Sequence, residues 1–177
     1  MAIRMPSKNE VEEAQAKNQK QRAQELVDET LPKVESGATD ITIWFQLAAG
    51  YMGLDEWDMA ADVLDKSPET DDRFTHGWAN ISLAYRELGK FEKAVDAARK
   101  SLNLSPRNLT AQVNLGLALV ELGRFNEAKL VLEKVLQVQS NQPMALVGLI
   151  ATYRGLGDVD AAEKMRQRAA NAGIRIV

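Results

Sequence analysis

Apolar and small residues recur along most of the chain at a fixed interval of 34 positions. Four columns keep this interval without an insertion. They contain Leu47, Ile81, Leu115 and Leu149; Tyr51, Tyr85, Leu119 and Tyr153; Trp57, Phe91, Phe125 and Val159; and Ala60, Ala94, Ala128 and Ala162. Self-similarity at a fixed period of a few tens of residues is typical of repeat proteins. The columns therefore predict four consecutive units, whose first residues are Ile41, Thr75, Leu109 and Pro143.

The pattern within each unit predicts two helices joined by a short turn. In the unit that begins at Thr75, apolar and small residues three and four positions apart form one face of a helix. Gly89 follows and predicts the helix end, since glycine readily adopts the left-handed conformation found there. A second stripe runs from Phe91 to Leu102. Pro106 ends it, because proline cannot donate the helical hydrogen bond.

The first and fourth units depart from this pattern. Asp55 stands where the other units have the loop glycine, and aspartate tolerates the left-handed conformation better than most residues, so we expect the turn to be kept. In the last helix, Glu163 and Arg166 replace the apolar Val95 and Ala98 of the second unit. Because the end of a repeat array needs a polar outer face, this helix is expected to cap the array itself.

The unit resembles the tetratricopeptide repeat (TPR), whose 34-residue pattern has aromatic, leucine-glycine, tyrosine, alanine and late proline positions. The best match contains Trp78, Ile81, Ser82, Tyr85, Gly89, Phe91, Ala94 and Pro106. The resemblance covers residues 41 to about 176. It implies an all-α fold, a right-handed α-solenoid of four TPR helix-turn-helix units with an N-terminal capping helix. The expected domains are residues 1–40 as leader and capping helix, then TPR units at 41–74, 75–108, 109–142 and 143–177.

Residues 1–40 do not match a full repeat. Ser7 and Glu10 have the spacing of a capping box and predict a helix start. Leu31-Pro32 predicts the helix end, because the residue before a proline avoids the helical conformation. Two interpretations are open for this segment. It is either an N-terminal cap with a solvated, frayed leader, or an amphipathic arm that swaps onto another subunit.

The C-terminal residues Gly173–Val177 also have two interpretations. Ile174 and Ile176 alternate with a charged residue, which suits an extended segment. The tail either folds over the last helix or serves as a strand-like ligand for a neighbour's groove.

Composition argues against several classes of chemistry. The chain has no cysteine and a single histidine, His76, so thiolate metal sites and paired-histidine metal sites are excluded. Its formal charge of −3 argues against a nucleic-acid partner. We find no signal peptide and no apolar run that could span a membrane, and expect a cytoplasmic protein without direct membrane insertion. No nucleophile has an identifiable base, so we expect no enzyme activity, cofactor or metal.

The TPR resemblance assigns a partner-binding groove to the first helix of each unit. It implies that the following residues face the concave side: Phe45, Ala49, Met52, Ala79, Asn80, Leu83, Arg86, Val113, Asn114, Leu117, Val120, Val147, Ala151 and Arg154. TPR proteins that hold the acidic C-terminal peptide of heat-shock chaperones have a lysine in the fifth column of the unit and an asparagine in the ninth. This chain has neither, which argues against that carboxylate clamp.

Each kind of groove residue has a functional role and a packing role to weigh. Asn80 and Asn114 either bind the backbone of an extended peptide or pack between repeats. Arg86 and Arg154 are candidates for pairing with acidic groups of a ligand. The apolar residues of the groove belong either to an exposed surface or to the core.

These features favour a protein–protein interaction module. The leading hypothesis is an adaptor or assembly factor that binds a peptide or amphipathic segment in its groove. A second hypothesis is a self-assembling TPR scaffold, a homo-oligomer whose groove is filled by a neighbouring subunit. A third is a dedicated chaperone that shields apolar segments of its clients.

Overall fold

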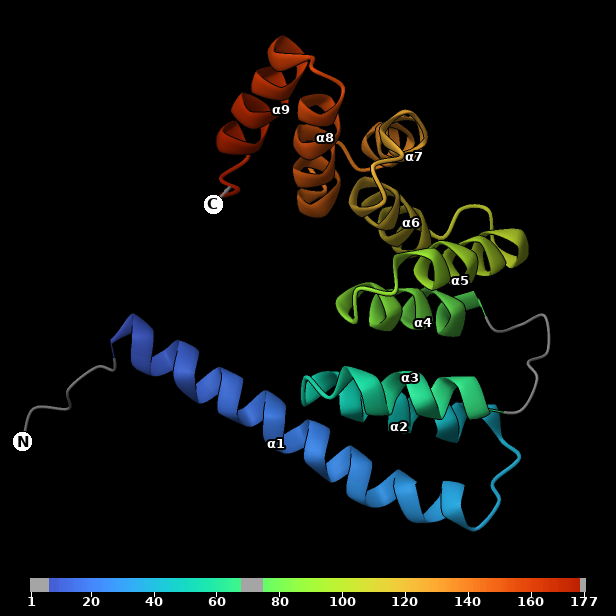
Figure 1. The fold of residues 1–177 in the computed structure, drawn as a ribbon. Coiled ribbons are helices and arrows are strands. Elements are labelled where there is room, and N and C mark those ends of the chain that lie inside the picture. Colours follow the sequence, from blue (N-terminus) through green and yellow to red (C-terminus); the bar gives the residue numbers. More distant parts are fainter. Residues whose placement is uncertain (1–6, 68–74, 176–177) are drawn as a thin grey trace, which may run out of the picture. The chain divides into compact units, whose positions relative to one another are not determined.

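All regular structure in the computed structural model, which describes residues 7–67 and 75–175, is helical (Figure 1). The chain divides into two compact units between residues 70 and 71. The N-terminal unit contains α1 (Lys8–Glu35), α2 (Ile41–Gly53) and α3 (Trp57–Lys66). The C-terminal unit contains α4 (Thr75–Glu87), α5 (Phe91–Leu104), α6 (Leu109–Glu121), α7 (Phe125–Val138), α8 (Pro143–Gly155) and α9 (Val159–Asn171).

The helices follow the 34-residue period closely. The helices α2, α4, α6 and α8 begin at the residues where the sequence pattern starts its four units. Asp55 adopts a φ of 64° and is the only non-glycine residue with a positive φ among the described residues. The predicted turn between α2 and α3 is therefore kept without a glycine, because aspartate pays a smaller steric penalty in this conformation than most side chains.

The prediction that the first helix ends at Leu31-Pro32 is wrong, because α1 continues to Glu35. Pro32 lies in the last turn, where its missing N–H removes a single helical hydrogen bond. The end of the helix is set instead by Gly37, which has a φ of 86°. The amides of Gly37 and Ala38 donate to the carbonyls of Val34 and Lys33, and so satisfy two carbonyls of the last turn.

Among the described side chains of α1, the buried ones lie in its C-terminal half and pack within the N-terminal unit. Ala23, Val27 and Thr30 are buried, whereas residues 12–22 are exposed along their whole length. Figure 1 shows this half of α1 beside α2, with the other half extending beyond it. The part of the expected leader that the structure describes is therefore helical, and its side chains at residues 12–22 are exposed. The close approach of α1 and α2 depends on Gly50, where an added Cβ would lie 2.7 Å from Val27 Cγ2.

The C-terminal unit builds its core between successive helix pairs. The first helices pack in series, α4 on α6 and α6 on α8, and each also packs against the second helix of its own repeat. The alanine column is buried throughout: Ala60, Ala94 and Ala128 have no exposed surface and Ala162 is 5% exposed. Small side chains at these positions let helix backbones approach closely.

Leu132 fills the centre of this core. Its side chain is fully buried and comes from α7. A Cβ added at Gly116 of α6 would overlap the Leu132 side chain, and one added at Gly148 of α8 would lie 2.8 Å from Leu132 Cδ1. The two glycines thus provide the space that this leucine occupies.

The described part of the C-terminal tail folds over α9. Gly173 has a φ of 73°, and the amide of Ile174 donates to the carbonyl of Ala169 at 2.9 Å. Ile174 is half-buried and packs against the core of the C-terminal unit. Ile174 therefore agrees with the interpretation in which the tail folds over the last helix. Ile176 and Val177 lie outside the described residues.

Candidate functional site

A pocket of about 320 Å³ lies on α4, α6 and the start of α8 in the C-terminal unit. Five residues that the sequence places in the groove line it: Leu83, Arg86, Val113, Asn114 and Leu117. Five others also line it, namely Leu109, Thr110, Gln139, Gln142 and Met144. Thr110 and Met144 are the second residues of their units, a column that the TPR resemblance also assigns to the concave side. Gln139 and Gln142 come from the loop between α7 and α8, so first-helix columns do not indicate them.

The apolar side chains around this pocket differ in how much surface they expose. Val113 and Leu117 are 7% and 8% exposed, so they form its floor. Leu83 is half-buried, whereas Met144 and Val147 are 41% and 36% exposed. A partner could therefore bury most additional apolar area against α4 and α8.

Of the other predicted groove residues in this unit, Val120, Asn80 and Ala151 are half-buried and Arg154 is exposed. Arg154 forms no ion pair with any residue in the described ranges.

Asn114 links two first helices. Its side-chain amide donates to the backbone carbonyl of Ala79 at 2.9 Å, and the residue is 5% exposed. This bond fixes α6 against α4 and satisfies a buried polar side chain. Ala79 is 1% exposed, so its side chain has no surface to offer a partner in this structure.

Arg86 is the cation of the pocket. Its Nη2 atom donates to Glu87 Oε1 at 2.6 Å, and its side chain is 18% exposed. The Nε atom is buried and has no hydrogen-bond partner within the described part of the chain. No acidic side chain lines the pocket. The guanidinium group is therefore only partly satisfied by the protein itself.

Phe45, Ala49 and Met52, the remaining predicted groove residues, lie on α2 in the N-terminal unit. Phe45 and Met52 are half-buried and Ala49 is exposed. These three residues belong to the N-terminal unit, and their place in a groove shared with the C-terminal unit stays a prediction.

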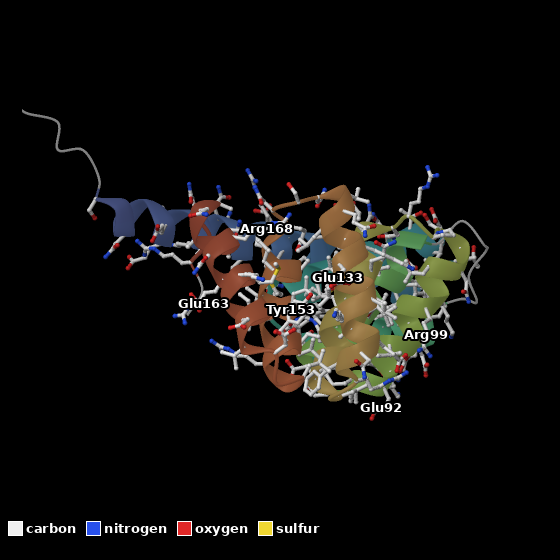
Figure 2. All side chains as sticks on the ribbon, turned by 90° about the horizontal axis from the view of Figure 1, so that it is seen from above. Glu92, Arg99, Glu133, Tyr153, Glu163 and Arg168 are labelled. Carbon is white, nitrogen blue, oxygen red and sulfur yellow. The ribbon has the colours of Figure 1, made fainter. Side chains whose placement is uncertain are left out.

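A second surface, which the sequence pattern does not indicate, lies between α7, α8 and α9. A pocket of about 280 Å³ is lined by Glu133, Leu136, Gln137, Leu149, Tyr153, Met165 and Arg168. Figure 2 shows Glu133, Tyr153 and Arg168 in this region of the unit. The Tyr153 hydroxyl donates to Glu133 Oε1 at 2.7 Å, and the Lys129 ammonium lies 5.2 Å from the centre of the Tyr153 ring. Tyr153 belongs to one of the four repeat columns, whereas Glu133 belongs to none of them.

The environment of Tyr153 disfavours its ionised form. Burial raises the pKa of Tyr153 to about 12, and its hydrogen bond to the Glu133 carboxylate acts in the same direction. The phenol therefore stays protonated and keeps donating to Glu133 over the neutral and mildly alkaline range.

We expect Tyr153→Phe to reduce the loss of stability at high pH. The stabilisation from the neutral phenol is complete below its ordinary pKa of 10.0 and is lost as pH rises through about 12. Between about pH 9 and 11, the unmodified protein should lose about 1 kcal/mol more of its free energy of unfolding than Tyr153→Phe. Urea denaturation of both proteins at each pH measures this difference. Equal losses would show that Tyr153 ionises as readily in the folded as in the unfolded chain.

The described ranges contain no group of three or more His, Cys, Asp or Glu residues that could hold a metal ion. None of their helices is both long enough and apolar enough to cross a bilayer. His76 lies in α4, and its side chain is outside the described part of the structure.

Several solved structures are similar to the chain. MamA AMB-1 superposes with a TM-score of 0.76 and 22% identity, covering 89% of this chain and 92% of that one. YrrB, described as a TPR protein with an unusual peptide-binding site, gives 0.72 and 16% over 92% and 82%. The TPR-like repeats of a putative kinesin light chain from Podospora anserina give 0.70 and 18% over 96% of both chains. These similarities confirm an all-α, TPR-like solenoid.

The sequence was also compared with curated proteins and with protein families. No curated protein matches it significantly. Residues 10–173 match the family described as T7SS, ESX-1 secretion system protein EccA1, N-terminal domain. Because the match spans nearly the whole chain, this protein belongs to the EccA1 N-terminal domain family.

Proposed function

We propose that this chain is a protein-interaction module that holds a segment of another protein against α4, α6 and α8. The observation that carries the proposal is the pocket of about 320 Å³, whose lining includes the partly exposed apolar side chains of Leu83 and Met144. Burying apolar surface is a main source of binding free energy. An extended peptide or one face of an amphipathic helix has the dimensions for such a surface.

The comparisons support this proposal without naming the partner. YrrB is described as having a peptide-binding site, and the family is named for a component of a secretion system. We therefore propose that the partner is another protein of such a system, which this chain binds as an adaptor or assembly factor. A chaperone that shields an apolar client segment would use the same surface.

The described parts of the two chain ends offer little apolar surface for the pocket of a neighbouring copy. Residues 12–22 of α1 have only two alanines among charged and amide side chains, so they offer little apolar surface. Ile174 of the tail already packs against the core of its own unit. These observations favour a different protein as the occupant over the self-assembling scaffold.

A displayed library of random twelve-residue peptides tests the proposal on the full chain. We expect the unmodified protein to enrich peptides whose binding falls about tenfold or more with Met144→Glu, because Met144 lines the pocket and the new charge would be desolvated beside the apolar partner. Leu130→Glu is the matched control, since Leu130 is 62% exposed on α7 and does not line the pocket. Failure to enrich any peptide, or an equal loss with both variants, would contradict the proposed site.

Light scattering across a range of concentrations tests the scaffold alternative. A monomer supports a pocket that is open to another protein. A discrete oligomer that dissociates with Met144→Glu and persists with Leu130→Glu would show that a second copy covers this surface, and would replace the adaptor proposal.

A further inference from the structure

The Arg86 side chain has a hydrogen-bonding capacity that the described residues do not use. Its Nε–H is buried and has no acceptor among the described residues. Buried polar groups almost always have a partner, since an unsatisfied donor has lost its water without a replacement. Arg86 also lines the pocket, so an acceptor supplied by a bound segment could satisfy it.

Among the described residues, Arg86 donates only to Glu87, and a ligand carboxylate can replace this acceptor. Glu87 is the next residue in the chain, and its side chain is 37% exposed while it accepts from Arg86 Nη2. Ion pairs that are open to solvent contribute little stability. A ligand carboxylate can therefore take over or share this edge of the guanidinium, accepting from both Nε and Nη2 in the bidentate geometry that arginine favours.

The charge distribution of the chain points to the same kind of ligand. The N-terminal unit has 14 Asp and Glu residues against 7 Lys and Arg, whereas the C-terminal unit has 11 against 15. The pocket therefore belongs to a unit with a formal charge of +4, although the whole chain has −3. The net positive charge of this unit attracts acidic ligands and repels basic ones.

We propose that this pocket selects a protein segment in which a carboxylate side chain lies beside apolar side chains, and that Arg86 is the residue that selects the carboxylate. This inference rests on the proposed function and adds the chemistry of the partner. The carboxylate accepts from the Arg86 guanidinium, and the flanking apolar groups pack against Leu83 and Leu117 and against Met144 at the start of α8. Leu83 is one helical turn before Arg86, so both face the same part of the pocket.

The test uses the library-selected peptides and the full chain. We expect Asp or Glu next to an apolar residue in most selected peptides. Replacing that acidic residue with Asn or Gln in a synthetic peptide should weaken binding about tenfold or more, because a charge-assisted bidentate pair is lost. Binding should also weaken as the salt concentration rises.

Two variants and one control identify the cation that acts. Arg86→Gln should abolish the preference for acidic over amide peptides. Arg107→Gln removes the same charge from the same unit at an exposed position outside the pocket, and should leave the preference intact. Glu87→Gln should tighten binding of the acidic peptide, because it removes the carboxylate that competes for Arg86.

The outcomes separate this inference from the proposed function. Selected peptides that bind the pocket without any acidic preference, or that keep the preference in Arg86→Gln, would overturn the role of Arg86 and leave the binding module in place. A selection that yields no peptides sensitive to Met144→Glu would overturn both. An acidic preference lost only in Arg86→Gln would establish the inference.

Discussion

We expect Leu132→Ala to lower the free energy of unfolding of the C-terminal unit by about 3–5 kcal/mol. Leu132 is fully buried and fills the space beside Gly116 of α6 and Gly148 of α8. Glycines have no side chain with which to refill the cavity, so the loss of dispersion contacts adds to the loss of hydrophobic burial. Urea denaturation followed by circular dichroism measures the change.

Leu130→Ala is the matched control for this prediction, because it makes the same substitution two residues away in α7. Leu130 is 62% exposed, and we expect a change within about 0.5 kcal/mol. Similar effects of the two substitutions would contradict the described packing of α7.

A double-mutant cycle tests the contact between Leu132 and Gly116 directly. Gly116→Ala alone should destabilise by about 1–3 kcal/mol, because its Cβ overlaps the Leu132 side chain. In the double variant the new methyl group enters the cavity left by Leu132→Ala, so the combined loss should be smaller than the sum of the two single losses.

The fold is predictable from the sequence because its signals are local and repeated. Each turn needs a residue that tolerates a positive φ, and this requirement places Gly89, Gly123 and Gly157 at equal intervals. Asp55 meets the same requirement in the first unit. The turn residues predict where helices end, and the buried columns predict which helix faces are buried. Both signals lie within a few residues of the feature they predict, so the repeat can be identified without knowledge of long-range contacts.

The features that the sequence does not predict depend on contacts between distant residues. Pro32 has a local signal for a helix end, but α1 continues for three residues because the bond lost in the last turn is a small penalty. Asn114 occupies a groove column, yet its side-chain amide donates to the backbone carbonyl of Ala79, which is 35 residues earlier in the chain. The pairing of Tyr153 with Glu133 joins two helices and has no fixed sequence spacing to reveal it.

The repeat pattern also does not predict the division into two units. The 34-residue interval passes from the unit of Ile41 to the unit of Thr75 without a change of phase, although the compact units divide between residues 70 and 71. The period records which residues pack within a helix pair. The predicted groove over all four repeats therefore stays a prediction.

The N-terminal unit gives the second large effect: Gly50→Ala should destabilise the packing of α1 on α2 by about 2–3 kcal/mol. The added Cβ would lie 2.7 Å from Val27 Cγ2 and 3.1 Å from the Ala23 carbonyl oxygen. A side chain can rotate away, but a backbone carbonyl moves only with the whole helix, so α1 must shift from α2. Hydrogen exchange should show faster exchange in the C-terminal half of α1.

Ala49→Val is the control, because it enlarges the neighbouring, exposed residue and should leave that exchange nearly unchanged. If the two variants show equal exchange rates in α1, Gly50 is not the point of close approach. The buried side chains of α1 alone must then hold it against α2.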